Sequence, residues 1–105
     1  MKELNTDVRI PFQSYFKRQM VEGQKLVTSR SRRLGEKGQT FVAFDCRFLI
    51  LGVHQRPLSW VRDYLWWFEG CQSPEAFVRT WVSIYKSAGW TPDRQVWVHA
   101  FGRLE

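Results

Sequence analysis

The chain has 105 residues, which is long enough to bury a hydrophobic core but too short for two domains, so a single domain over residues 1–105 is expected. Apolar residues make up 44% of the chain, which argues against a disordered protein. The longest apolar run, residues 48–53, is far too short to cross a bilayer. Cys46 and Cys71 form no CxxC pair and have no histidine pair nearby, so neither a metal site nor a cofactor is expected.

The formal net charge of +6 is unevenly distributed. Residues 1–40 contain nine Lys and Arg against four Asp and Glu, whereas residues 41–105 contain seven against six. The excess centres on a basic cluster that consists of Arg30, Arg32, Arg33 and Lys37. Clustered positive charge attracts polyanions, although a solvated basic loop would show the same composition.

The N-terminal segment, residues 1–7, is polar and is expected to be loose. It lacks the apolar region of a signal peptide. Two buried, reduced thiols are favoured over a disulfide. Together these features predict a cytoplasmic protein that is not associated with a membrane.

The first part of the chain predicts a short strand at residues 8–10, a helix at 12–22, an extended segment at 25–28 and a basic loop at 29–39. Pro11 stops the strand, and Gly23 ends the helix. Phe12, Phe16 and Met20 share one face of that helix, which is expected to be its buried side.

The second part predicts a hairpin of strands 40–44 and 47–54 with a turn at Asp45-Cys46. Pro57 opens a helix that reaches Glu69-Gly70 and carries two apolar stripes, so burial on two sides is expected. Ser73 caps a second helix that Gly89 closes.

The final strand, residues 95–101, is apolar on both faces, which is typical of a central or barrel position. Few strands are available, so they must curl around one core while the helices close its ends. The fold class is therefore expected to be α+β.

The segment from Gly23 to Arg30 contains the first candidate site. Chain reversal at Gly23 would place Lys25, Thr28 and Arg30 on the rim of a cleft. A lysine with a lowered pKa can act as a base that activates a hydroxyl, and an arginine can hold a phosphate or a carbonyl. A surface lysine, a strand threonine and a salt-bridged arginine would show the same spacing. In a regular strand positions 25 and 28 face opposite ways, so a shared site requires a bend or a bulge.

Glu69 is the second candidate. It is expected at the end of an apolar helix, where the helix dipole and partial desolvation would favour the protonated carboxyl that a general acid needs. An exposed glutamate before a glycine cap would give the same pattern. The two histidines, His54 and His99, fall on predicted strands and are interpreted as packed or surface residues.

Four motifs follow one another along the chain: Gly23-x-Lys25-x-x-Thr28-x-Arg30, Gly38-Gln39-Thr40-Phe41, Glu69-Gly70 followed by Ser73-Pro74-Glu75-x-Phe77 and Trp81, and Val96-x-Val98-His99-x-Phe101. Their types and order resemble the ASCH family, a relative of the PUA domains, over about residues 8–102. The resemblance implies a small curled PUA-like β-barrel with flanking helices and a cleft between them.

The resemblance also implies a role linked to RNA. Some small bacterial members are amidohydrolases that remove the acetyl group from N4-acetylcytidine, and their catalytic residues would correspond to Lys25, Thr28 and Glu69. Other members are linked to RNA binding, RNA cleavage or transcriptional coactivation. Many members have Gly-Asp where this chain has Gly38-Gln39, which removes a carboxylate that could pair with an arginine such as Arg30.

The favoured interpretation is a domain that binds RNA or a modified nucleoside. The basic cluster would contact phosphates, and Trp67 or Trp97 would stack on a base. In the second interpretation the chain is a hydrolase of a modified nucleoside, with Lys25 as base, Thr28 as nucleophile and Glu69 as proton donor. In the third, exposed tryptophans contact a partner protein. The oligomeric state is left open.

Overall fold

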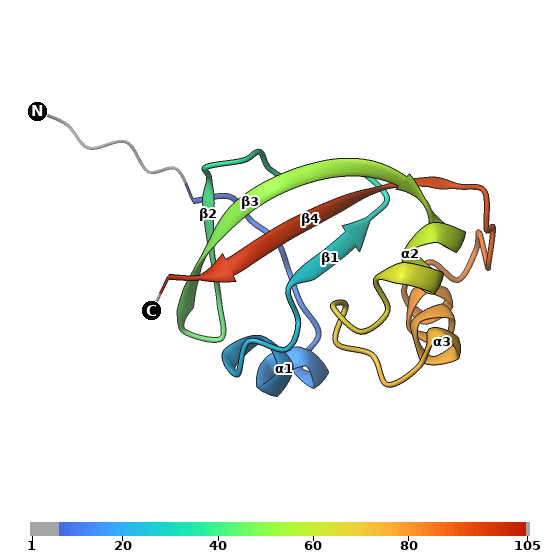
Figure 1. Cartoon of the computed structure of the whole chain (residues 1–105), viewed down its shortest axis with the longest axis horizontal. Helices are drawn as coiled ribbons and strands as arrows, with labels where there is room; N and C mark the ends of the chain where they lie inside the picture. Colours follow the sequence, from blue (N-terminus) through green and yellow to red (C-terminus); the bar gives the residue numbers. More distant parts are fainter. Residues whose placement is uncertain (1–6, 105) are drawn as a thin grey trace, which may run out of the picture.

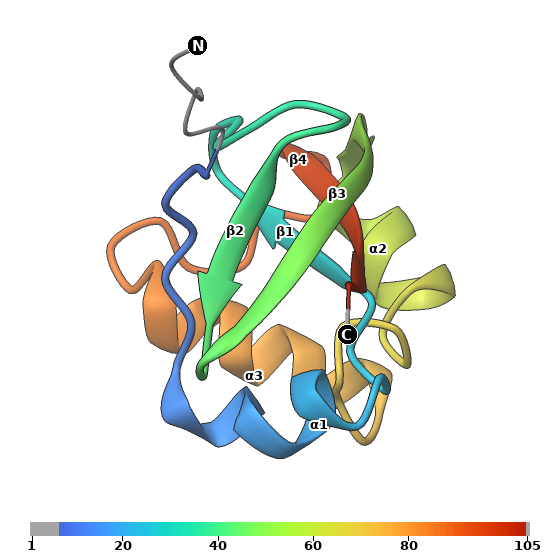
Figure 2. The same ribbon diagram turned by 90° about the vertical axis from the view of Figure 1, so that its left-hand side faces the viewer.

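A computed structural model describes residues 7–104 of the chain. Its centre is an antiparallel sheet with the strand order β1-β4-β3-β2 (Figure 1). The strands are β1 (Val27–Arg30), β2 (Thr40–Ala43), β3 (Cys46–Pro57) and β4 (Gln95–Arg103). The sheet arches over the helices as a curled half-barrel (Figure 2). The predicted α+β class and the small, curled, barrel-like architecture are therefore confirmed.

Strand β4 lies between β1 and β3, which confirms the central position predicted from its two apolar faces. Val96 and Val98 pack into one hydrophobic cluster, and Phe101 packs into the other. Strand β4 therefore pairs with β3, which continues the sheet to β2, and with β1, which is an outer strand.

The β2–β3 hairpin turns at Phe44 and Asp45, since Ala43 and Cys46 are paired. Both turn residues have positive φ, 53° and 63°, as in the two-residue turns that match the twist of a hairpin. The turn predicted at Asp45-Cys46 is therefore one residue too late.

Strand β3 runs on to Pro57, three residues beyond the end expected from the sequence, because β4 supplies partners as far as Gln95. Between Ile50 and Gly52 its register with β4 shifts, and Leu51 is the additional residue of a β-bulge. A bulge increases local twist, which allows this long strand to follow the curve of the half-barrel.

The strand predicted at residues 8–10 is wrong. Val8 donates a hydrogen bond to Thr40 O at 2.7 Å, and Asp7 forms an isolated parallel bridge with Thr40, but no strand follows. Residues 1–6 of the expected loose terminus lie outside the described residues. Asp7 itself is held in place, because its carboxylate accepts hydrogen bonds from Thr40 and Arg47.

The helix predicted at residues 12–22 is shorter than expected. A 3-10 turn, η1 (Ser14–Phe16), leads into α1 (Lys17–Val21), so Phe12 precedes the helix. Gly23 ends it as predicted, with φ +78° and with its N–H donating to Met20 O.

Helix α2 (Leu58–Tyr64) ends before Leu65, and residues 65–70 form turns rather than the predicted continuation to Glu69. Leu58 and Val61 are buried, but the second predicted stripe, Trp60, Tyr64 and Trp67, is exposed. The prediction that this helix is buried on two sides is therefore wrong, because the sheet and α3 cover only one side of α2.

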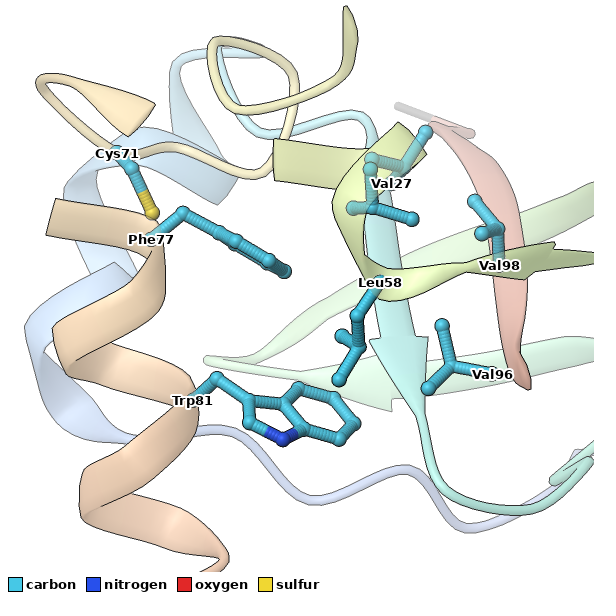
Figure 3. Packing of buried hydrophobic residues seen from close by; sticks show 8 residues of the cluster. Val27, Leu58, Cys71, Phe77, Trp81, Val96 and Val98 are labelled. Atoms are coloured by element: carbon cyan, nitrogen blue, oxygen red, sulfur yellow. The ribbon is translucent and has the colours of Figure 1, made fainter. Parts of the chain in front are cut away.

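Helix α3 (Pro74–Ile84) begins where the sequence predicts. Ser73 Oγ accepts a hydrogen bond from the main-chain N–H of Ala76 at 3.0 Å, and Pro74 occupies the first turn. The helix ends at Ile84, five residues before Gly89. Phe77 and Trp81 point from α3 toward Leu58 (Figure 3).

Two hydrophobic clusters form the core. The first joins α2, α3, β1 and β4 and contains Val27, Leu58, Val61, Cys71, Phe77, Trp81, Val96 and Val98. The second lies inside the curl of the sheet and contains Ile10, Phe16, Met20, Phe41, Phe48, Ile50 and Phe101. Members of both clusters, Phe16 of the second and Phe77 and Trp81 of the first, line the cavity that contains the candidate site.

Candidate functional site

A cavity of about 320 Å³ opens beside β1, between α3 and the segment that contains η1. Its polar lining consists mainly of Lys25, Thr28, Ser29, Arg30 and Glu69. Its aromatic lining consists of Phe12, Phe16, Phe77, Trp81 and Tyr85. The three predicted catalytic residues and one member of the basic cluster therefore line the same cavity.

Lys25 and Glu69 form a buried ion pair at the base of the cavity. The side chain of Lys25 is only 3% exposed and that of Glu69 only 6%, and Lys25 Nζ lies 3.2 Å from Glu69 Oε1. Nζ also donates to Glu69 O at 2.7 Å and to Val27 O at 2.9 Å. Three oxygen acceptors thus match the three donors of an ammonium group. Burial lowers the pKa of Lys25, and the Glu69 carboxylate opposes that effect.

The predicted position of Glu69 at a helix end is wrong, although its burial is confirmed. Glu69 belongs to the turns that follow α2, and its N–H donates to Leu65 O at 2.9 Å. Glu69 therefore lies beyond the end of α2 rather than in its last turn. Its carboxylate is instead held by Lys25 on one oxygen and by Ser29 on the other, with Ser29 Oγ 2.6 Å from Glu69 Oε2.

The expected conflict between positions 25 and 28 does not arise, because the strand begins only at Val27. The N–H groups of Leu26 and Val27 both donate to Phe68 O, at 2.7 and 3.1 Å, and this places Lys25 before the strand. Thr28 and Ser29 then follow the alternation of a strand. The Ser29 hydroxyl contacts Glu69, whereas the Thr28 hydroxyl contacts Arg30.

Arg30 connects β1 to the opposite wall of the cavity. Its Nε donates to Thr28 Oγ1 at 3.0 Å, and its Nη2 donates to Pro11 O. The guanidinium lies over the Phe12 ring, 4.9 Å from the centroid. Burial lowers the pKa of Arg30, but a guanidinium stays charged at neutral pH. Arg30 is thus a positive group held in place in the lining of the cavity.

A further wall of the cavity is aromatic and is formed by the C-terminal half of α3 and by Tyr85, the residue that follows it. Trp81 and Tyr85 are stacked, with centroids 4.2 Å apart and an interplanar angle of 29°. Tyr85 Oη also accepts the main-chain N–H of Ser31 at 3.3 Å, which ties the end of α3 to the residue after β1. Neither residue was predicted to line a cavity, because their spacing along the chain carries no sign of one.

His99 is fully buried behind β1 and is not among the residues that line the cavity. Its Nε2 accepts the N–H of Leu34 at 3.0 Å, so the ring proton resides on Nδ1, which lies 3.2 Å from Thr28 O. Burial lowers the pKa of His99. The prediction of a packed histidine is confirmed. His54, in contrast, is exposed on β3.

The remaining predicted binding residues lie outside the cavity lining. Arg32, Arg33 and Lys37 are exposed on the loop after β1, and Arg33 lies 5.6 Å from the Trp97 ring centroid. Trp67 is 62% exposed beside α2. Neither tryptophan lines the cavity, and Phe12, Trp81 and Tyr85 occupy the wall positions that they were expected to fill.

Both cysteines are free thiols, and only Cys71 is buried. Cys71 lines the cavity, where burial and the nearby Glu69 carboxylate raise its pKa to about 11.

The helices within residues 7–104 are all too short or too polar to span a bilayer.

Solved structures with the same fold agree with the motif resemblance. Protein EF3133 from Enterococcus faecalis V583, of the family model DUF984, aligns with a TM-score of 0.68 and 18% identity, covering 86% of this chain and 70% of that one. Hypothetical protein PH0355 aligns with a TM-score of 0.68 and 14% identity, covering 89% and 94%.

An ASCH domain from Lactobacillus crispatus JV V101 aligns with a TM-score of 0.58 and 10% identity, covering 90% of this chain and 76% of that one. No protein-family model and no curated protein matches the sequence significantly. At these identities the alignments establish the fold alone. The chain therefore has the ASCH-domain fold that its four motifs predicted.

Proposed function

We propose that the cavity binds a nucleobase, carried by a free nucleoside or by single-stranded RNA, and that the chain acts in RNA metabolism. One observation supports this above the others: the polar residues Lys25, Thr28 and Glu69 line the same cavity as a set of aromatic side chains. Small-molecule pockets span about 300–1,000 Å³, so a cavity of about 320 Å³ suits a single base or nucleoside. Aromatic walls favour flat rings.

The basic cluster supports RNA as the carrier of the base. Arg30 lines the cavity, and the loop that follows it carries Arg32, Arg33 and Lys37 on the surface. A base inside the cavity would leave its phosphates near this loop. RNA affinity should then fall steeply with salt, because each phosphate contact releases counterions. The affinity for an uncharged nucleoside should change little.

The test uses a cavity-filling variant and a matched control on the same helix. Ile84 lines the cavity at the end of α3, whereas the neighbouring Ser83 is exposed and is not among the lining residues. We expect Ile84→Trp to weaken binding of cytidine, uridine and a short single-stranded RNA at least tenfold, as measured by calorimetry. Ser83→Trp should bind like the natural chain. Equal binding by both variants, or no binding by the natural chain, would refute the proposal.

Hydrolysis of an acetylated nucleoside is a second candidate, favoured by the convergence of Lys25, Thr28 and Glu69 on one cavity. Transfer of one proton across the 3.2 Å contact between Lys25 and Glu69 would give a neutral amine and a neutral acid. The amine would accept the Thr28 proton as Oγ1 attacks the acetyl carbon. The acid would protonate the departing cytidine nitrogen, and water would then release acetate from the Thr28 ester.

This candidate is tested with pure protein and N4-acetylcytidine. We expect release of cytidine and acetate by the natural chain, and loss of turnover without loss of folding in Thr28→Val. Ser29→Ala serves as the neighbouring hydroxyl control and should retain turnover above that of Thr28→Val. Binding without turnover by the natural chain would exclude the hydrolase and leave the binding function.

A further inference from the structure

The outer edge of β1 borders the cavity, and its main-chain groups are almost fully used. On the inner side Phe101 N donates to Leu26 O at 2.9 Å. On the outer side Val27 N donates to Phe68 O, and Val27 O accepts from Lys25 Nζ. Further along, the N–H of Ser31 donates to Tyr85 Oη. Both ends of the outer edge are therefore covered by other parts of the chain.

Ser29 lies between these two covered positions. In an antiparallel strand, successive residues direct their N–H and C=O groups to alternate sides, so the main chain of Ser29 points outward as that of Val27 does. Across residues 7–104, no hydrogen bond to the Ser29 N–H or C=O is found on that side. Ser29 is nevertheless 93% buried and lines the cavity. Buried main-chain groups in native proteins nearly always have partners.

The geometry points to a main-chain recognition site at Ser29, in which its N–H and C=O pair with the amide or amidine edge of a six-membered nucleobase. This inference rests on the proposed function and specifies how the base is recognised. The N–H donates to a ring nitrogen or carbonyl oxygen of the base, and the C=O accepts a ring N–H or an amino group. Uracil and cytosine each present such a neighbouring donor and acceptor.

The covered neighbours exclude a peptide strand as the natural occupant of this edge. Strand addition requires a row of free groups along the edge, and here Phe68 and Tyr85 leave only one residue open. A flat ring needs one such pair and gains contact with the aromatic walls formed by Phe12 and Trp81. The site is thus suited to a single base rather than to an extended chain.

Methylated nucleosides test this inference, because a methyl group can be placed on or off the recognised edge. We expect uridine and 5-methyluridine to bind with similar affinity and 3-methyluridine to bind at least tenfold more weakly. For cytidine, the matched pair is 5-methylcytidine, which leaves the edge free, and N4,N4-dimethylcytidine, which blocks it, and the same difference in affinity is expected. Binding of the nucleosides that carry no methyl group on the recognised edge should also slow hydrogen exchange at the Ser29 amide.

A side-chain variant separates the main chain from the hydroxyl. Ser29→Ala keeps the N–H and C=O and removes the contact with Glu69, so the discrimination between the methylated nucleosides should persist. Loss of discrimination in Ser29→Ala would overturn the inference. A second outcome would also overturn it: equal binding of the nucleosides methylated on the recognised edge and of those methylated at C5. If Ile84→Trp abolished both, the proposed function would still stand. If an unrelated peptide slowed hydrogen exchange at the Ser29 amide and no nucleoside did, both the inference and the proposed function would be refuted.

Discussion

Lys25 Nζ donates hydrogen bonds to both the main-chain oxygen and the carboxylate of Glu69, at 2.7 and 3.2 Å. The two residues are 44 positions apart in the chain, so this pair fixes the turns after α2 against the start of β1. The same pair supplies the charged base of the cavity. Its removal should therefore affect both folding and ligand binding.

Lys25→Met should destabilise the fold strongly, because it leaves the Glu69 carboxylate buried without a cation. Breaking a buried ion pair costs about 3–5 kcal/mol, whereas replacing both partners with apolar groups can be nearly neutral. The free energy of unfolding in urea measures this cost. The double variant Lys25→Met with Glu69→Leu should recover much of the lost stability but bind no nucleoside. A double variant no more stable than Lys25→Met would contradict this view of the pair.

Gly70→Ala should destabilise the protein more than Gly23→Ala. Both glycines have positive φ, +85° and +78°, so each alanine meets backbone strain of about 1–2 kcal/mol. At Gly70 the added Cβ would also lie 3.1 Å from the Cβ of Lys25 and 3.3 Å from Phe16 Cδ1. At Gly23 nothing lies within 4 Å. Thermal unfolding of the two variants isolates the contact with Lys25, and equal losses would show that this contact is relaxed.

Stability should fall as the pH decreases below about 6.5, the ordinary pKa of histidine. Burial lowers the pKa of His99 in the folded chain, so the unfolded chain binds the proton more readily, and each such proton costs at most about 1.4 kcal/mol per pH unit. A second ring proton would also oppose the Leu34 N–H at Nε2. Urea midpoints at pH 7.5 and 5.0 should differ less in His99→Gln than in the natural chain. His54→Gln, on the exposed side of β3, should keep the full difference.

Cys71 should resist alkylation in the folded protein. With its pKa raised to about 11, less than about 1% of the thiol is ionised at pH 8, and burial blocks access to the sulfur. Mass spectrometry after iodoacetamide treatment should find Cys46 modified first, since it is only partly buried. Both thiols should react in urea. Early modification of Cys71 in the native chain would show that the cavity opens widely.

Features that depend on neighbouring residues were predictable from the sequence. The start of α3 follows from the Ser73-Pro74 cap, and the central place of β4 follows from the apolar residues on both of its faces. The gathering of Lys25, Thr28 and Glu69 at one cavity matches the site that the motif resemblance implied, although their chemical roles remain predictions.

Features that depend on contacts distant in sequence were not predictable. Ser29 was missed because its hydroxyl meets a carboxylate 40 residues away, and no local pattern marks that contact. The exposure of Trp67 was missed because it depends on what covers α2, not on the apolar character of the helix. Tyr85 joins the cavity because α3 ends beside Ser31, a packing detail that periodicity does not encode.

The two outer strands of the sheet, β1 and β2, contain only four residues each. Val8 donates to Thr40 along β2, much as Phe68 and Tyr85 cover β1. Long uncovered strand edges are where folded proteins associate into fibrous aggregates. Because both edges are short and that of β1 is largely occupied, the described part of the chain offers little template for such association, and its solubility at high concentration should not depend on surface charge alone.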